Sequence, residues 1–425
     1  MAKKKPNIRF KGFEEEWEES TLRLKFDFDT PHNSLSRDKL NDEVGDVKDI
    51  HYGDILIKYN SVVDVQNDAI PHITNSNESD FSDSLLKNGD VVFADTAEDA
   101  AAGKAVEIQN VDNTKVVAGL HTIVARPKEG FSSNFLGHLF NSDTYHSQLV
   151  PLLQGIKVLS ISKATLADTS FSWPSNKKEQ QAIGEFFQQL DELIGAKEQE
   201  LEKLRQMKQA LLDKMFPSDE ENTPPPIRFK GFTEKWMRMT IKDITSQPLD
   251  YGLNAPAGKY DGKIKYLRIT DIDDETRLFN MSDVTSPKLD NIPDSYRLRV
   301  RDLVFARTGA SVGKTYLYSR EDGDVCFAGF LIRARLKSCI SPYFIFTITQ
   351  TRNYDKFIKI TSQRTGQPGV NAQEYECFSF FAPSYEEQCL IGDFFHLQDE
   401  AINNSKKKIT KLRTIKQACL QQLFA

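Results

Sequence analysis

The chain has 425 residues, of which 39% are hydrophobic and 27% charged, and its formal net charge is -6. At this length and composition we expect two or more separately packed domains, which excludes a small scaffold held by disulfides. The acidic balance argues against a protein that coats nucleic acid nonspecifically, but it is compatible with a local basic groove.

The cysteine spacing and the lack of long apolar segments indicate where in the cell the protein is expected. The five cysteines show no CxxC spacing and all lie in the second half, at Cys326, Cys339, Cys377, Cys389 and Cys419. This spacing suits neither zinc nor redox chemistry and predicts a reducing environment. The basic start MAKKK leads into a charged segment without an apolar signal core, and no stretch approaches the ~18 apolar residues of a membrane span. We therefore expect a cytoplasmic protein that has no membrane partner, no metal and no cofactor.

A long internal repeat organises the chain. The segment IRFKGFEEEW at 8–17 returns as IRFKGFTEKW at 227–236, and residues 177–216 return in similar form at 385–424. The chain is therefore a tandem duplication of roughly 210 residues, far longer than a solenoid repeat. Each copy should be a globular domain followed by a connecting element. The acidic, Pro-rich segment at 217–226 is expected to be a semi-rigid linker.

The first part of each copy predicts a mixture of strands and helices. Strands are indicated by short β-branched or aromatic runs bounded by Gly, Asn or Asp. These runs are YGDILIKYNSVVDV, GDVVFADT, VVAGLHTIVARP, KIKYLRITDI, RDLVFARTG and CFAGFLIRARL. Helical patterns lie between them in NFLGHLFNSDTYHSQLV and PYFIFTITQTRNYDKFI. The predicted class is α+β, and the two copies share this rhythm with little sequence identity.

The second part of each copy predicts one long helix. No proline occurs between Pro174 and Pro217 or after Pro383, and apolar residues recur at helical spacing. Heptad a and d positions hold Leu190, Ile194, Leu201, Leu204, Leu211 and Met215, and in the second copy Ile402, Ile409, Leu412, Cys419 and Leu423. Lys208 and Lys416 are matching polar a positions, which commonly set the register of a coiled coil. Two matching helices on one chain favour mutual pairing over packing of each helix on its own domain alone.

The stretch RTGASVGKT at 307–315 partly matches a nucleotide-binding P-loop. The G-x-x-x-x-G-K-[ST] pattern fits at its last three residues, but Thr308 stands where the first glycine should be. In the first copy the glycine and lysine return as Gly103 and Lys104, but Ala105 replaces the hydroxyl residue that would hold magnesium. We therefore expect no ATP site, and we predict a loop that contacts the phosphodiester backbone of DNA.

Two catalytic alternatives fail on their motifs. A stand-alone adenine methyltransferase needs [DNS]PP[YF] and a Gly-rich turn for the methyl donor, whereas SPYF at 341–344 has one proline and predicts a helix start. A nuclease needs clustered carboxylates with a lysine, which PDSYRLRVRD at 293–302 does not offer. We therefore expect no enzymatic activity. A protein-protein scaffold that uses the paired helices without reading DNA bases remains the alternative.

The repeated motifs resemble those of a known family. The duplicated frame, EQQAIGEFF and EQCLIGDFF at the helix starts, KGF near each domain start and the Gly-Lys loops resemble the specificity subunit of Type I restriction-modification systems. The resemblance covers essentially the whole chain. It implies two target recognition domains that each read half of a bipartite, asymmetric site in double-stranded DNA, with the two helices paired antiparallel as a spacer.

The resemblance also implies partners and domain boundaries. A noncatalytic subunit of this kind carries two DNA adenine methyltransferase (modification) subunits, joined by restriction and translocase subunits in the full complex. The parts would be recognition domains at 1–176 and 227–384, conserved spacer helices at 177–216 and 385–425, and the linker at 217–226. A helix of about 38 residues spans roughly 55 Å at ~1.5 Å per residue. Successive major grooves on one face of DNA recur about every 34 Å, so such a spacer suits separated half-sites.

Candidate DNA contacts are polar residues in loops between the predicted strands and helices. Arg pairs efficiently with guanine and Asn or Gln with adenine, while Lys, Ser and Thr mostly hold phosphates. The candidates in the second copy are Arg307, Thr308, Ser311, Lys314, Gln363, Arg364, Gln367 and Asn371. The candidates in the first copy are Lys58, Tyr59, Asn60, Lys104, Lys157, Ser160, Ser162 and Lys163. The sequence does not indicate which bases are read, how far apart the half-sites lie, or whether restriction subunits are present.

Overall fold

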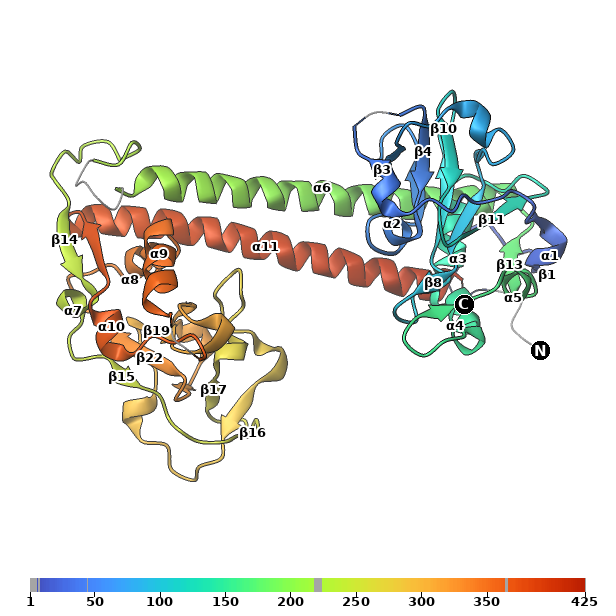
Figure 1. Ribbon diagram of the computed structural model, residues 1–425. Helices are drawn as coiled ribbons and strands as arrows, with labels where there is room; N and C mark the ends of the chain where they lie inside the picture. The colour runs from blue at the N-terminus through green and yellow to red at the C-terminus, as the bar shows by residue number, and fades with distance from the viewer. Residues whose placement is uncertain (1–5, 7, 44, 218–223, 364–365, 425) are drawn as a thin grey trace. The chain divides into compact units, whose positions relative to one another are not determined.

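The chain divides into two compact units. The computed structural model describes residues 6, 8–43, 45–217, 224–363 and 366–424 (Figure 1). Unit 1 comprises residues 1–197 and 408–425, and unit 2 comprises residues 198–407. Each unit therefore contains the start of one long helix and the end of the other.

Unit 1 is built on two sheets and two short ladders. The larger sheet has the order β2 (Phe26–Asp27), β11 (Thr122–Pro127), β7 (Val91–Ala94), β9 (Ala105–Gln109), β5 (Val62–Asp64). The smaller has the order β10 (Lys115–Ala118), β4 (Val47–Ile50), β6 (His72–Ile73), β3 (Leu40–Asn41). The ladders pair β1 (Trp17–Thr21) with β13 (Ser170–Pro174), and β8 (Thr96–Ala97) with β12 (Leu159–Ser160).

One predicted strand of unit 1 begins instead as a helix. The helices of this unit are α1 (Leu22–Lys25), α2 (Tyr52–Ile57), α3 (Phe135–Phe140), α4 (Asp143–Leu149), α5 (Lys163–Ala167) and the start of α6 (Lys177–Met215). The prediction of a strand through YGDILI was therefore wrong. The His51 side chain accepts a hydrogen bond from the Gly53 N–H and caps the helix, and Ile55 is buried while Ile57 is 88% exposed. Local capping outweighs the β propensity of this run.

Unit 2 repeats the α+β pattern with smaller sheets. Its main sheet has the order β15 (Asp250–Tyr251), β22 (Leu331–Arg335), β19 (Asp302–Ala306), β20 (Thr315–Leu317). Three ladders pair β14 (Met237–Thr240) with β23 (Ser379–Ala382), β16 (Ala257–Lys259) with β18 (Thr285–Pro287), and β17 (Lys265–Leu267) with β21 (Val325–Phe327). Its helices are α7 (Ile241–Ile244), α8 (Pro342–Ile348), α9 (Arg352–Thr361), α10 (Ala372–Glu376) and the start of α11 (Tyr385–Leu423). The SPYF segment begins α8, capped by Ser341, as predicted.

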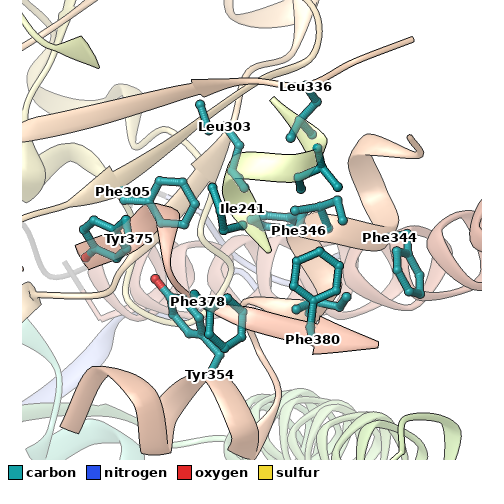
Figure 2. Packing of buried hydrophobic residues seen from close by; sticks show 14 of the residues in the cluster. Ile241, Leu303, Phe305, Leu336, Phe344, Phe346, Tyr354, Tyr375, Phe378 and Phe380 are labelled. Atoms are coloured by element: carbon teal, nitrogen blue, oxygen red, sulfur yellow. The ribbon is translucent and has the colours of Figure 1, made fainter. Parts of the chain in front are cut away.

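An aromatic core holds unit 2 together (Figure 2). The rings of Phe305 and Tyr375 lie 4.7 Å apart between their centroids. Phe216, which follows the end of α6, packs on Phe344 of α8 with 5.8 Å between ring centroids. Leu212 and Met215 of α6 belong to the same core. The end of the first repeat's helix is thus part of the core of the second unit.

Unit 1 shows the reciprocal arrangement. Leu420 and Leu423 of α11 and the following Phe424 lie in its main core. The Phe424 ring stacks on Phe187 at 5.9 Å and meets Trp17 edge-on at 6.3 Å between centroids. In both units the phenylalanine before the KGF motif also meets the Phe-Phe motif edge-on, Phe10 with Phe186 at 5.9 Å and Phe229 with Phe394 at 6.2 Å between centroids, so these repeated residues pack each helix base against its domain.

The two long helices run antiparallel. In unit 2 Lys208 of α6 forms an ion pair with Asp399 of α11, and in unit 1 Lys416 of α11 pairs with Asp191 of α6. In each unit the start of one helix therefore lies beside the end of the other (Figure 1). The matching lysines fix the same register in both units, as a polar a position does. Among the described residues no helix combines the length and apolar character of a membrane span.

The predicted apolar seam is largely correct. Ile194, Leu201, Ile402 and Ile409 are buried, as expected for a seam between paired helices. At the helix ends the predicted Met215 and Leu423 are buried, but Leu212 and Leu420 are buried in place of Leu211 and Cys419, which are only partly buried. The seam shifts there because the last turns face the domain cores as well as the partner helix.

Candidate nucleic-acid interface

The same two-strand frame underlies the candidate site in both units. In unit 1, Arg126 of β11 donates two hydrogen bonds to the buried carboxylate of Asp90, which precedes β7, at 2.9 and 2.7 Å. In unit 2, Arg335 of β22 donates two to Asp302 of β19, both at 2.8 Å. This shared pair aligns β7 with β19 and β11 with β22, and it supports the match between the loops that follow β7 and β19.

In unit 2 the structure brings the two predicted loops together. Thr308, which follows β19, forms a bridge with Gly369, and the Val370 N–H donates to the Arg307 carbonyl at 2.9 Å. The Gly309 N–H donates to the Pro368 carbonyl at 3.0 Å. We call residues 307–314 with residues 366–371 loop pair 2. Backbone hydrogen bonds hold the two loops against each other, so their side chains project from a fixed backbone.

Unit 1 brings together the corresponding loops. Ser160 of β12 pairs with Thr96 of β8, and the Ile161 N–H donates to the Asp95 carbonyl at 2.8 Å. We call residues 95–104 with residues 154–163 loop pair 1. Two loops that lie far apart in each copy of the sequence are thus adjacent in both units.

Arg307 has an aromatic support that the sequence analysis missed. Its guanidinium lies 4.9 Å from the centroid of the Tyr251 ring, and Tyr251 is 39% exposed. Stacking of this kind holds the planar guanidinium and leaves its edge available for paired hydrogen bonds. A Cβ added to Gly309 would lie 3.1 Å from the amide nitrogen of Gln367, so Gln367 reaches across the same loop. Phe330, 63% exposed, accepts a hydrogen bond at its carbonyl from the Arg307 N–H.

The repeated Gly-Lys pairs have a structural explanation. Lys314 is buried, donates to the Ile272 carbonyl at 3.0 Å and forms an ion pair with Asp274. Lys104 donates to the carbonyls of Leu56 and Tyr59 at 3.0 and 3.3 Å, and burial lowers its pKa. The preceding glycines both have positive φ, +91° and +85°, which other residues adopt only under strain. In both units the lysine thus fastens a neighbouring segment through backbone carbonyls rather than facing solvent.

The remaining candidates divide into supporting and exposed residues. Tyr59 lies in a core, Ser162 and Asn371 cap α5 and α10, and Lys163 donates to the Phe28 carbonyl at 3.0 Å. Ser162, Lys163 and Asn371 are nevertheless exposed, as are Lys58, Asn60, Lys157, Gln363 and Gln367, while Thr308, Ser311 and Ser160 are partly exposed. Arg364 lies outside the described residues.

A polar groove of about 420 Å³ adjoins loop pair 2. Its lining includes Ser311, Lys359 and Arg277, with Asp274 and Asp355 beside them. Arg277 and Lys359 were not among the predicted contacts, because neither follows a predicted strand. Their position indicates that α9, which carries Lys359, and the connection between β17 and β18, which carries Arg277, contribute basic side chains to the same surface.

The structural role of Lys314 gives a direct test. We expect Lys314→Met to lower the free energy of unfolding by about 1–3 kcal/mol, because the Ile272 carbonyl loses its buried donor. Urea unfolding of the full chain measures this, and hydrogen exchange of β20 locates the change. The exposed Lys359 provides a matched control, since Lys359→Met should stay within about 0.5 kcal/mol. Equal effects of the two substitutions would contradict the assignment.

The chain is similar in sequence and in fold to known proteins. Residues 15–206 match the family model described as "Type I restriction modification DNA specificity domain". This segment is therefore similar to the DNA specificity domains of Type I systems. The whole chain is similar to the S subunit of a Type I restriction-modification system from M. genitalium, at 15% identity over 99% of both chains, with a TM-score of 0.64.

A second similar structure extends the comparison. It is described as "Structural basis underlying complex assembly and conformational transition of the type I R-M system", and one of its chains matches at 14% identity, with a TM-score of 0.53. The match covers 96% of this chain and 97% of that one. No curated protein matches the sequence. The resemblance to specificity subunits is confirmed by the family of the matched segment and by the fold of the chain.

Proposed function

We propose that the chain is the DNA-reading subunit of a Type I restriction-modification complex. It reads a bipartite, asymmetric site in double-stranded DNA, one half with each unit. It carries two DNA adenine methyltransferase subunits to that site, and restriction and translocase subunits in the full complex. The observation that carries the proposal is the repeated loop pair, in which each unit holds two polar loops together at the end of the same two strands.

The proposed contacts lie on the two loop pairs and their borders. In unit 2 they are Arg307, Thr308, Ser311, Gln363, Arg364, Gln367 and Asn371. In unit 1 they are Lys58, Asn60, Lys157, Ser160, Ser162 and Lys163. We assign Lys104, Lys314 and Tyr59 to support of these surfaces, because their polar or aromatic groups are directed into the protein. The recognition domains would span 1–176 and 227–384, and the antiparallel helices at 177–216 and 385–425 would act as the spacer, with 217–226 as the linker.

The proposed asymmetry follows from the side chains. The two loop pairs share a backbone frame but carry different polar groups, and different hydrogen-bonding groups select different base pairs in the major groove. One chain therefore has no reason to read a palindrome. This function would place the protein in the cytoplasm, with the DNA.

Methylation mapping tests this function. In cells that express the chain with its methyltransferase partner, we expect methylated adenines in an asymmetric two-part sequence. The pattern should vanish when this chain alone is deleted. Combined Lys157→Ala and Lys163→Ala should weaken methylation about tenfold or more, since each lost phosphate contact reduces affinity. Single-molecule sequencing measures these changes, and Lys87→Ala, at an exposed lysine of the same unit, serves as the control.

The opposite outcome has a definite meaning. Methylation that does not depend on this chain would remove the DNA-reading function. The noncatalytic protein-protein scaffold, which uses the paired helices without reading bases, would then be the better description.

A further inference from the structure

Asp95 and Arg307 occupy the same place in the two units. Each directly follows the aligned strand, since β7 ends at Ala94 and β19 at Ala306. The Asp95 N–H donates to the His121 carbonyl, and the Arg307 N–H donates to the Phe330 carbonyl, both at 3.0 Å. The backbone carbonyl of Asp95 in turn accepts from the Ile161 N–H at 2.8 Å, and that of Arg307 accepts from the Val370 N–H at 2.9 Å. In both units the donor belongs to the second loop of the pair. The backbone frame is thus the same, and the side chain has the opposite charge.

Neighbouring residues hold both side chains in place and leave part of each charged group available. Arg307 stacks on Tyr251 beside the exposed Phe330. In unit 1, Asp95 accepts from Thr96 Oγ1 at 2.7 Å and lies 3.3 Å from His121 Nδ1, with both contacts made by Asp95 Oδ1. Within the part of the chain that the structure describes, Asp95 Oδ2 accepts no hydrogen bond. The Asp95 side chain is 23% exposed, and the His121 ring rests edge-on against Tyr52 at 5.2 Å between centroids.

Hydrogen-bond polarity distinguishes what these groups can bind. A guanidinium only donates, and its two N–H groups match the O6 and N7 acceptors of guanine. An ionised carboxylate only accepts, and it matches the N4 amino group of cytosine. A carboxylate facing the guanine edge, or a guanidinium facing the cytosine amino group, would leave like groups opposed.

We propose that Asp95 and Arg307 are equivalent specificity-determining residues of opposite polarity. Arg307 reads a guanine in one half-site, and Asp95 reads a cytosine in the other, with Thr96 and His121 fixing one carboxylate oxygen. This inference rests on the proposed function, because it concerns how the same surfaces select bases.

Selection from random duplex DNA tests the assignment. The full chain, bound to its methyltransferase subunits, is incubated with duplexes of random sequence, and the retained DNA is sequenced. The wild type should enrich a two-part motif with a G·C pair at one position of each half. Arg307→Gln and Asp95→Asn should each change one such position to an A·T pair, because amide side chains pair with adenine. The preference for G·C there should fall about tenfold or more, and the other half should be unchanged.

Matched variants control for indirect effects. Arg320→Gln and Asp83→Asn make the same chemical changes at exposed positions of the same units and should leave the motif unchanged. Where Asp95→Asn fails to fold, judged by its melting temperature, Asp95→Glu keeps the charge with a longer reach and should broaden the preference in the same half only.

The selection experiment separates failure of the proposed function from failure of the inference about Asp95 and Arg307. A wild-type complex that enriches no two-part motif overturns the proposed function and this inference with it. A wild-type motif that Arg307→Gln and Asp95→Asn both leave intact overturns the inference alone.

Discussion

Replacing Arg228 with alanine is expected to lower the free energy of unfolding of unit 2 by about 3–5 kcal/mol, as loss of one partner of a buried ion pair does. The Glu387 carboxylate is fully buried and accepts from Arg228 Nε and Nη2 at 2.7 and 2.8 Å. The hydrogen bond to Glu387 raises the pKa of Arg228, so the guanidinium stays charged. Without Arg228 a carboxylate remains in the interior with no cation. Urea unfolding of the full chain measures the loss.

Two further variants separate an orphaned charge from lost packing. Arg228→Met combined with Glu387→Leu replaces the pair by apolar groups of similar volume and should recover most of the stability. Arg9 and Glu179 form the same two hydrogen bonds in unit 1, at 2.6 and 2.7 Å, so Arg9→Ala should shift protection from hydrogen exchange in unit 1 instead. A double variant as unstable as Arg228→Ala would show that the pair itself, rather than the unpaired carboxylate, matters.

This ion pair explains why the IRFKGF and EQ motifs could be recognised in both copies of the sequence. The arginine of each IRFKGF segment binds the glutamate of each EQ motif, although 159 residues separate Arg228 from Glu387. The neighbouring glutamines, Gln180 and Gln388, donate to the Pro174 and Pro383 carbonyls and so fix each helix start. The motifs that identified the duplication therefore form the same contact in both units, between the start of the domain and the start of its long helix. The long helices were equally predictable, because their apolar spacing is a local property repeated over 39 residues.

The candidate site was only partly predictable for the same reason. Sequence patterns identified both loops of each pair, since polar and Gly-rich segments between strands and helices are visible locally. The direction of a side chain is decided by distant neighbours. Lys314 looked like an exposed phosphate ligand, but its partner carbonyl belongs to Ile272, 42 residues away. Asp95 was not among the predicted contacts, although GDVVFADT and RDLVFARTG place it opposite Arg307, because an acidic side chain did not fit the Arg, Lys, Asn and Gln pattern of the candidates.

Asp49 should make the stability of unit 1 depend on pH below neutrality. Its carboxylate, on β4, is fully buried; Oδ2 accepts from Asn33 Nδ2 at 2.6 Å, and among the described residues Oδ1 has no hydrogen-bond partner. Burial raises the pKa of Asp49 to about 6, above the 3.8 of an unperturbed aspartate. The folded state therefore holds this proton more tightly than the unfolded state does. Stability from this group is greatest below the unfolded pKa and is lost as pH rises through about 6.

Since each pKa unit is worth ~1.4 kcal/mol, this loss should reach about 2 kcal/mol between pH 4 and pH 7. Asp49→Asn cannot ionise, so we expect it to gain on the wild type by up to that amount over the same interval. Hydrogen exchange of β4 and β10 measures the change, and comparison of the two proteins at each pH cancels the intrinsic pH dependence of exchange. Asp83→Asn, at an exposed position, should show no such gain. A constant difference between Asp49→Asn and the wild type from pH 4 to pH 7 would mean that Asp49 ionises normally, and that water or local opening reaches the carboxylate in the folded protein.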